Sequence, residues 1–290
     1  MKTIKILMIT LILVSFSSLF SVFNDYEPSP RARALGGAYY TISNDANAIF
    51  YNPAGLNLAG NCINASNTKP FGNDFQKLNN FALSVKLPEK FGTVGMGLKS
   101  MKVSYLDVNL HSEYTYSLGH AFTLMKDIHS ELLVGYTANF YHVSTLTTEI
   151  DSNDRETQNT VGFDVGALAT LHRRTKLAFT VTNINNPKFT GEEQNHDLPR
   201  KFAMGISYEP YYGVSTSLEL KKTFEQQGTE VHAGIEFVLY EILTLRTGLR
   251  NLPSSYSIGF GLDFKNILID YGFNTHEIGC THHFGIGYKL

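Results

Sequence analysis

The sequence predicts an all-β protein, a transmembrane antiparallel β-barrel of about 14 strands with an N-terminal hatch, or plug. Three observations carry this prediction. From Asn61 onward, apolar and polar residues alternate with a period of two in almost every segment. The connections between these segments alternate between short and longer ones. The chain opens with a secretory signal, so the domains we expect are residues 1–21 (signal peptide), 22–60 (hatch with a short helix) and 61–290 (barrel).

The first 21 residues have the pattern of a cleaved signal peptide. Lys2 and Lys5 supply the positive start, residues 6–20 are mostly apolar, and Ser17 or Ser21 supplies a small residue for cleavage. A membrane-anchoring helix is the alternative. After this segment no stretch reaches the roughly 18 apolar residues of a spanning helix. We therefore expect export to the outer membrane of a Gram-negative-type bacterium, with any further crossing made by strands.

The next segment reads as a compact plug of small residues. Adjacent glycines permit a tight backbone approach or positive φ, and Asp45-Ala46-Asn47-Ala48 can open a short helix capped by Asp or Asn. Pro53 disfavours helix at Asn52, and Gly55 permits a turn, so we expect residues 52–56 to launch the first strand. A surface helix–turn is the alternative. The hatch motif comprises Gly36, Gly37, Ala38, Asp45, Ala46, Asn52, Pro53, Ala54, Gly55 and Leu56.

The barrel strands follow from the alternation. In residues 214–221, for example, Val214, Thr216, Leu218 and Leu220 share one face, opposite Ser215, Ser217, Glu219 and Lys221. A spanning strand needs about 9–11 residues, and the predicted strands are 61–69, 77–87, 92–103, 112–123, 131–143, 159–171, 175–185, 199–208, 212–223, 229–238, 242–250, 254–264, 266–274 and 281–290. Because lipid-facing and lumen-facing residues alternate, an unremarkable mean hydropathy does not exclude a membrane barrel.

The connections fall into two alternating sets. One set is short, around Glu89, Lys126, Arg173, Pro210, Tyr240 and Lys265. The other tends to be longer and more polar, around Asn73, Asp107, residues 144–159, residues 186–198, Gln226, Pro253 and His276. Outer-membrane barrels have short turns at one end and longer loops at the other, whereas a soluble β-sandwich does not need this asymmetry.

The stretch LGGAYYTISNDANAIFYNPAGL, from Leu35 to Leu56, resembles the N-terminus of FadL-like outer-membrane proteins, and within them it is most similar to the PorV/PorQ branch. Three later stretches also resemble PorV-like proteins: LPRKFAMGISYEP from Leu198, GIEFVLYEILTLRTGLRN from Gly234, and the ending LIDYGFN…GCTHHFGIGYKL. The chain departs from the family pattern in closing on Leu290 instead of an aromatic residue, and in its short loops.

The resemblance implies two functions. The PorV/PorQ branch implies an accessory role in type IX protein secretion, with a translocon and cargo proteins as partners. The wider FadL family implies passive transport of hydrophobic small molecules. The resemblance of the C-terminal half to PorV-like proteins favours the secretion role. The short loops weaken it, because they leave little surface for binding a cargo protein. A purely structural outer-membrane protein is the third possibility. All three share outer-membrane lipid as a partner, and the net charge of −2 argues against nucleic acid.

Charged residues on the predicted inner face are the main candidate site. The set is Lys201, Glu219, Lys221, Glu236, Arg246, Asp263 and Asp270, together with Lys86, Lys99, Arg250 and Lys289. Because both signs occur, no strong ion selectivity is expected. We expect these residues to pair with one another and with Arg31, Arg33 and Asp45 of the hatch. Lining the lumen as structure and contacting a solute directly both remain open for them.

No chemistry beyond this is expected. A catalytic Ser/His pair would need both side chains on one face of the barrel near its outer rim. Only His142 and Ser144, two residues apart, meet this condition locally. One such pair is too weak a signal, so we predict no enzyme and no cofactor. His276, Cys280, His282 and His283 form a cluster, but His282 and His283 point to opposite faces of a strand, so no metal is expected. Cys62 and Cys280 would lie near opposite ends of neighbouring strands, beyond the roughly 7 Å that a disulfide allows. We predict two free thiols.

Overall fold

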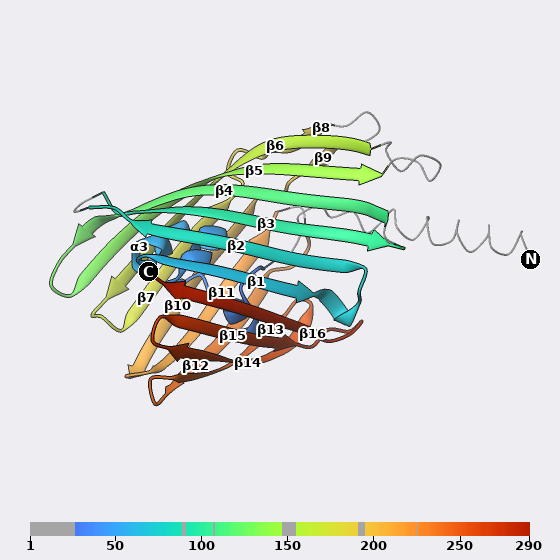
Figure 1. Cartoon of the computed structure of the whole chain (residues 1–290). Helices are drawn as coiled ribbons and strands as arrows, with labels where there is room; N and C mark the ends of the chain where they lie inside the picture. The colour runs from blue at the N-terminus through green and yellow to red at the C-terminus, as the bar shows by residue number, and fades with distance from the viewer. Residues whose placement is uncertain (1–26, 89–90, 107, 147–154, 191–194, 225) are drawn as a thin grey trace, which may run out of the picture.

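A computed structural model describes residues 27–88, 91–106, 108–146, 155–190, 195–224 and 226–290. The predicted signal peptide, residues 1–21, lies outside the described residues. Fourteen strands form a closed barrel in which each strand pairs antiparallel with its neighbours (Figure 1). The first and last strands close it, with Cys62 opposite Lys289 and Lys69 opposite His282. The predicted fold is confirmed.

The barrel strands agree closely with the segments predicted from alternation. Their bounds are β1 Cys62–Lys69, β2 Gln76–Lys86, β3 Thr93–Tyr105, β4 Val108–Lys126, β5 Ser130–Leu146, β6 Arg155–Leu171, β7 Thr175–Thr182, β10 Lys201–Tyr211, β11 Val214–Thr223, β12 Glu230–Leu239, β13 Leu243–Asn251, β14 Ser254–Phe264, β15 Ile267–Asn274 and β16 Thr281–Lys289. A separate two-stranded sheet, β8 Lys188–Thr190 with β9 Asn195–Asp197, lies where the sequence predicts only a loop. Strands of three residues are too short for alternation to reveal.

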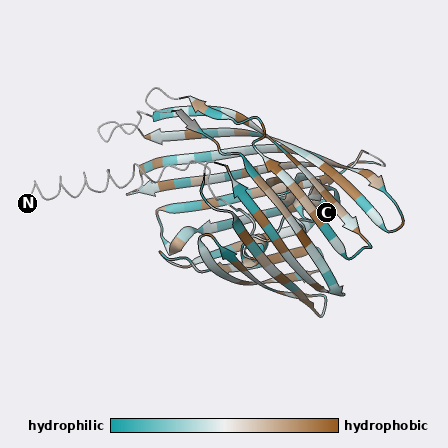
Figure 2. Ribbon diagram, turned by 180° about the vertical axis from the view of Figure 1, so that it is seen from behind, coloured by the Kyte–Doolittle hydropathy of each residue, from teal (hydrophilic) through white to brown (hydrophobic). Residues whose placement is uncertain are grey.

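The two faces of the wall differ in polarity, as the alternation requires. On β4, Tyr116 and Leu118 point outward and are 49 % and 64 % exposed, whereas the alternate residues Thr115 and Ser117 point inward and are each 1 % exposed. Hydrophobic and hydrophilic residues alternate along the strands in Figure 2. So large an exposed apolar surface is unfavourable in water and suits contact with lipid.

The two ends of the barrel are unequal. The short-turn end carries the C-terminus, and the opposite, long-loop end carries the longer connections. Two connections expected to be longer, at Asp107 and Pro253, join strands only two residues apart, between Tyr105 and Val108 and between Asn251 and Ser254. At the first of these the prediction fails because β3 and β4 continue past the predicted segments.

The wall is tallest at β4 to β6. These strands have 19, 17 and 17 residues, whereas β7 has 8 and pairs only with the Val165–Leu171 half of β6. Beyond this ladder, the backbone N–H of Ile184 donates to the Phe163 carbonyl at 2.9 Å. Phe189 and Leu198 then pack with Tyr141 and Val143 in a buried apolar cluster. The described parts of the β7–β10 connection, residues 183–190 and 195–200, therefore fold back onto the wall at the long-loop end.

Short helices precede and interrupt the strands: α2 Pro30–Ala34, η1 Ala46–Phe50, η2 Pro53–Gly55, α3 Leu56–Ala59 and η3 Pro70–Gly72. No helix in the described part of the chain is long and apolar enough to cross a membrane. Asp45 caps η1, accepting from the Asn47 backbone N–H at 2.8 Å, as expected of the short helix. However, residues 52–56 do not launch the first strand: the Asn52 side chain caps η2, α3 follows, and β1 begins at Cys62.

Candidate functional site

The candidate site is the lumen and what fills it. Residues 27–60, called here the N-terminal segment, lie inside the barrel against its inner face. Helix α2 packs on β13 to β16, η1 on β1 to β4, and η2 on β4 to β6. The first described residue of the segment, Glu27, lies near Lys221 in the long-loop half of the barrel. Before β1 begins, the segment passes Thr123 close to the short-turn end. It therefore runs through the length of the lumen.

Glycines on both surfaces allow this close packing. Gly36 and Gly37 adopt φ of +64° and +89°, a left-handed conformation that other residues rarely adopt. A Cβ placed on the facing wall residue Gly248 would lie 2.3 Å from the Gly36 nitrogen, and one on Gly135 would lie 2.4 Å from the Pro53 carbonyl carbon. Gly55 is different, because its φ of −64° is one that any residue can adopt. A glycine is needed there because a side chain would collide with Ser43, not because the chain turns.

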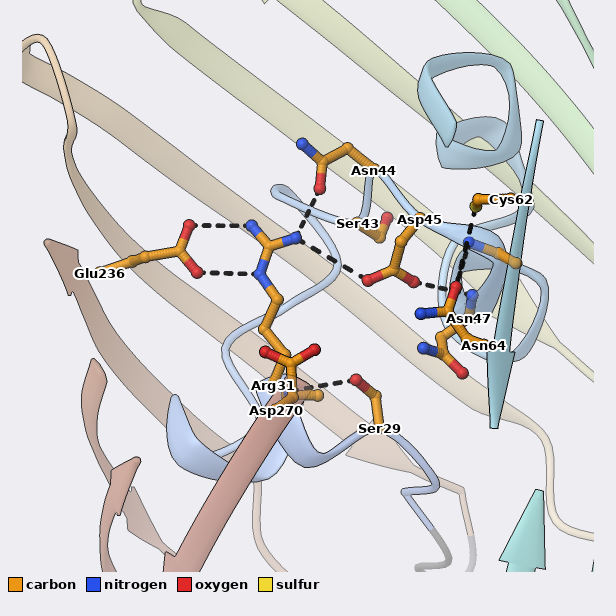
Figure 3. Close-up of polar contacts among 12 residues, drawn as sticks. Ser29, Arg31, Ser43, Asn44, Asp45, Asn47, Cys62, Asn64, Glu236 and Asp270 are labelled. Carbon is orange, nitrogen blue, oxygen red and sulfur yellow. Dashed lines mark hydrogen bonds and ion pairs between the residues drawn. The ribbon is translucent and has the colours of Figure 1, made fainter. Parts of the chain in front are cut away.

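An arginine of the N-terminal segment anchors it to the wall (Figure 3). The Arg31 guanidinium donates two parallel hydrogen bonds to the Glu236 carboxylate, each 2.8 Å, and a third to Asn44 Oδ1 at 2.6 Å. Asp45 lies 3.8 Å from the same guanidinium. Such two-pronged pairs are among the stronger polar contacts in proteins. Burial raises the pKa of the Asp45 carboxyl, and the Arg31 charge opposes this rise.

The Arg31 pair continues along the wall. Arg246 donates to Glu236 at 2.8 Å and to Asp270 at 2.6 Å, so four of the charges form one chain of ion pairs. The sequence predicts that Glu236, Arg246 and Asp270 face the lumen, and the structure places them together. It could not predict the pairing with Arg31, because Arg31 and Glu236 are 205 residues apart.

A glutamate of the wall binds the backbone of the segment directly. Glu219, whose side chain is 1 % exposed, accepts from the backbone N–H groups of Tyr39, Tyr40 and Thr41 at 2.9, 3.1 and 2.8 Å. The Thr41 hydroxyl adds a fourth bond at 2.9 Å. A buried carboxylate needs such compensation, because leaving it without partners would cost a great deal of free energy.

A second group of charges lies toward the long-loop end. The Lys221 ammonium is 3.6 Å from Glu27 and 3.3 Å from Glu230. His232 is 3.2 Å from Glu230, and its Nδ1 lies 2.6 Å from the Gly36 carbonyl oxygen. Lys221 therefore joins the segment to the wall as Glu236 does.

Of the remaining predicted charges, Asp263 and Lys289 lie apart from these groups, whereas Lys201 and Arg250 line cavities beside the second group. Asp263 pairs with Lys289 at 2.5 Å near the short-turn end, where their side chains are 34 % and 51 % exposed. Lys201 lines a cavity of about 240 Å³ at the long-loop end. The other residues around this cavity are Thr223, Gln226, Gln227, Gly228, Glu230, Leu252 and Pro253. A second cavity, beside Arg33 and Arg250, has only about 10 Å³.

The histidines and cysteines form no further site in the part of the chain that the structure describes. No group of three or more His, Cys, Asp or Glu side chains there is arranged to hold a metal ion. His282 is exposed and His283 is buried, on opposite faces of β16. Cys62 is buried, Cys280 is exposed, and both are free thiols, as predicted. Cys62 pairs with Lys289, at the opposite end of β16 from Cys280.

Comparison with known proteins shows which solved structures share this fold. Searches with protein-family models and among curated proteins find no match. Among solved structures, the Ralstonia pickettii toluene transporter TbuX matches with a TM-score of 0.65 at 13% identity, over 93% of this chain and 100% of that chain. The CymD monoaromatic hydrocarbon channel matches with a TM-score of 0.66 at 12% identity, over 93% and 99%. A Pseudomonas aeruginosa FadL homologue matches with a TM-score of 0.55 at 10% identity, over 90% and 95%.

The chain has the fold of these channels. At such low identity the likeness concerns the fold alone. It nevertheless covers nearly the whole chain, and the position of the N-terminal segment is compatible with it. It agrees with the resemblance to FadL-like proteins at the level of the wider family, and nothing in it singles out the PorV/PorQ branch.

Proposed function

We propose that this protein is an outer-membrane barrel that lets small hydrophobic molecules across by passive transport. The observation that carries the proposal is a closed 14-strand barrel, apolar outside, whose fold extends over nearly the full length of transporters for toluene and other hydrocarbons. The neighbours are transport channels, which also supports the expectation that the chain is not an enzyme. Outer-membrane lipid around the apolar wall is its structural partner.

In this proposal residues 22–60 form the hatch. The part of it within the described residues, 27–60, is held to the wall by Glu219, Glu236 and Lys221. The cavity beside Lys201 lies at the long-loop end, which in barrels of this kind faces outside the cell. A solute from outside would therefore meet this cavity before it met the hatch.

Uptake by whole cells tests the proposal. A strain lacking the gene should take up radiolabelled toluene, supplied at low concentration, several-fold more slowly than the parent. A plasmid copy of the wild-type gene should restore the rate. Uptake of glucose serves as the control and should be the same in all strains. Equal toluene uptake with and without the gene would contradict the transport function.

An accessory role in type IX secretion is the second candidate. It is supported by the resemblance of residues 35–56 and of the C-terminal half to PorV/PorQ proteins. The tall wall of β4 to β6, with the β7–β10 connection packed against it, provides a surface for a protein partner. Comparing the secreted proteins of the deletion strain and the parent decides this candidate: loss of a group of secreted proteins supports it, and an unchanged profile counts against it.

A further inference from the structure

Three lysines lie side by side on the outer face of the barrel wall, near the long-loop ends of three consecutive strands. They are Lys69 of β1, Lys77 of β2 and Lys102 of β3, called here the lysine row; Figure 1 shows these strands next to one another. Lys77 lies directly opposite Lys102. The β1–β2 register, which joins Thr68 to Leu78, brings Lys69 next to Lys77. All three lysines are exposed, whereas Thr68 and Leu78 on the inner face are buried.

The lysine row is only partly neutralised by acidic side chains. Like charges directly opposite each other in an antiparallel pair are destabilising, so the row needs counter-charges. Asp74 of the β1–β2 connection lies 2.6 Å from Lys69. The hydrogen bond and the charge of Lys69, with a smaller effect from the Lys77 charge, lower the pKa of the Asp74 carboxyl. Among the described residues, no carboxylate lies within 4 Å of the Lys77 or the Lys102 ammonium. Three ammonium groups and one carboxylate leave the row and Asp74 with two positive charges.

Another lysine at the same end of the barrel shows what an occupied ammonium group looks like. Lys222, near the long-loop end of β11, donates to two backbone carbonyl oxygens of the β11–β12 connection, at 2.8 and 2.7 Å. In the part of the chain that the structure describes, Lys77 makes no such bond, and Lys102 only lies over the Tyr114 ring, 5.8 Å from Nζ to the ring centre. These two ammonium groups therefore keep their hydrogen-bonding capacity for a partner outside the chain.

From the lysine row toward the middle of the strands, the outward side chains become polar and then apolar. The next outward residues on β1, β2 and β3 are Asn67, Asn79 and Ser100, and the ones after them are Ala65, Phe81 and Leu98. The Asn67 side-chain amide donates to Asn79 Oδ1 at 2.7 Å, so the polar level is joined across two strands. A membrane lipid has the same order of charged head, polar linkage and apolar chains. The wall therefore matches such a molecule at three successive levels.

We propose that the lysine row binds the headgroup phosphates of a lipid in the outer leaflet, with Lys77 and Lys102 as its main partners. The long-loop end of an outer-membrane barrel faces outside the cell, which places the row at that leaflet. Phosphate oxygens accept strong hydrogen bonds from ammonium groups, and their negative charge relieves the repulsion between the two lysines. The inference goes beyond the proposed function, because it requires a barrel in the outer membrane and the passage of no solute.

Native mass spectrometry of the purified full chain in a nonionic detergent tests the site. The probe is lipid A with two phosphate groups, and lipid A with one phosphate and the same acyl chains is the comparison. We expect the two-phosphate form to bind at least fivefold more tightly. The double variant Lys77→Gln/Lys102→Gln should abolish this preference. Lys265→Gln is the matched control and should keep it, since Lys265 is also exposed and lies over an aromatic ring, but at the short-turn end.

A neighbouring acid gives a test in the opposite direction. Asp74→Asn removes the one carboxylate beside the row and releases Lys69, so it should tighten binding of the two-phosphate lipid several-fold. Weaker or unchanged binding would contradict a phosphate site at the row. Stability gives a second reading: on a heat-modifiable gel, the two-phosphate lipid should raise the unfolding temperature of the wild type and leave that of the double variant unchanged. Equal stabilisation of both proteins would also count against the site.

Three further results would overturn the proposal: equal affinity for the two forms of lipid A, a preference that survives in the double variant, or displacement of the lipid by a tenfold excess of inorganic phosphate. The last result would make this a site for free phosphate. Should the double variant fail to fold, the single variants Lys102→Arg and Lys102→Gln decide the matter. Lys102→Arg keeps the charge and should keep the preference, whereas Lys102→Gln should lower it; equal preference in both refutes the site.

Discussion

Glu219 of the barrel wall accepts two hydrogen bonds from Thr41, one from its backbone N–H at 2.8 Å and one from its hydroxyl at 2.9 Å. The two residues are 178 positions apart in the chain. With Tyr39 and Tyr40 also donating to this carboxylate, a single wall side chain fixes three consecutive backbone groups of the N-terminal segment. This contact makes the attachment of the segment open to direct test.

Removing the Glu219 carboxylate should loosen the segment. Glu219→Ala leaves three buried backbone N–H groups without an acceptor, at about 1–3 kcal/mol each, so we expect a loss of at least about 3 kcal/mol. The folded band on a heat-modifiable gel should disappear at a lower temperature, and trypsin should cleave after Arg31 or Arg33. Glu241→Ala, in an exposed turn, is the control and should behave as wild type. Equal protease resistance in both variants would remove Glu219 from this role.

Gly36 should tolerate a side chain less well than Gly60. Both have positive φ, +64° and +66°, so an alanine at either site is strained. A Cβ at Gly36 would lie 2.6 Å from the Leu249 backbone nitrogen, whereas one at Gly60 meets nothing within 4 Å. We expect Gly36→Ala to lower the temperature of barrel unfolding clearly more than Gly60→Ala, while both insert into membranes. Equal effects would show that backbone strain alone matters at Gly36.

The Arg31 anchor should depend on geometry as well as charge. Arg31→Met leaves Glu236 with only Arg246 as its partner, and breaking a buried pair in this way costs about 3–5 kcal/mol. Arg31→Lys should recover only part of this, because an ammonium cannot make two parallel bonds. Arg173→Met in an exposed turn is the control. Thermal unfolding of Arg31→Met, Glu236→Gln and the double variant should be strongly non-additive; additive losses would mean that the two side chains act independently.

The two cysteines should react unequally. Cys280 is exposed and Cys62 is 3 % exposed, so the folded protein should take up one maleimide, at Cys280. Mass spectrometry should show the second label only after denaturation, and Cys280→Ser should abolish the first. Two labels on the folded protein would contradict the burial of Cys62, and none would indicate a bridge.

The strands could be predicted well because each has two different environments. On β11 the alternation of Leu218 and Leu220 with Glu219 and Lys221 reflects lipid outside and lumen inside, and the pattern repeats along most of the strands. The inward direction of the charged residues follows from the same alternation. Short elements cannot be predicted from this alternation. Helix α2 has five residues and β8 has three, which are too few for any period to be visible.

The contacts of the lumen could not be predicted in the same way. A single sequence carries no signal that Arg31 meets Glu236 or that Glu219 meets Thr41, because each pair forms only when the barrel closes. The start of β1 was predicted to within one residue, at 61 against Cys62, but the role of residues 52–56 was wrong for a local reason. Asn52 was expected to end a helix and begin a strand, but its side chain accepts from the Ala54 N–H and begins another helix.

The seam of the barrel, where β1 meets β16, has a consequence for assembly. Cys62 and Lys289 must find each other across almost the entire chain, and pairings of such long sequence separation are slow to form. The N-terminal segment directly precedes β1 and touches the inner face of strands on all sides of the barrel. We therefore expect the segment to lie among the strands before β1 and β16 pair. In that order of folding, the sheet closes around the segment and the last strand encloses it.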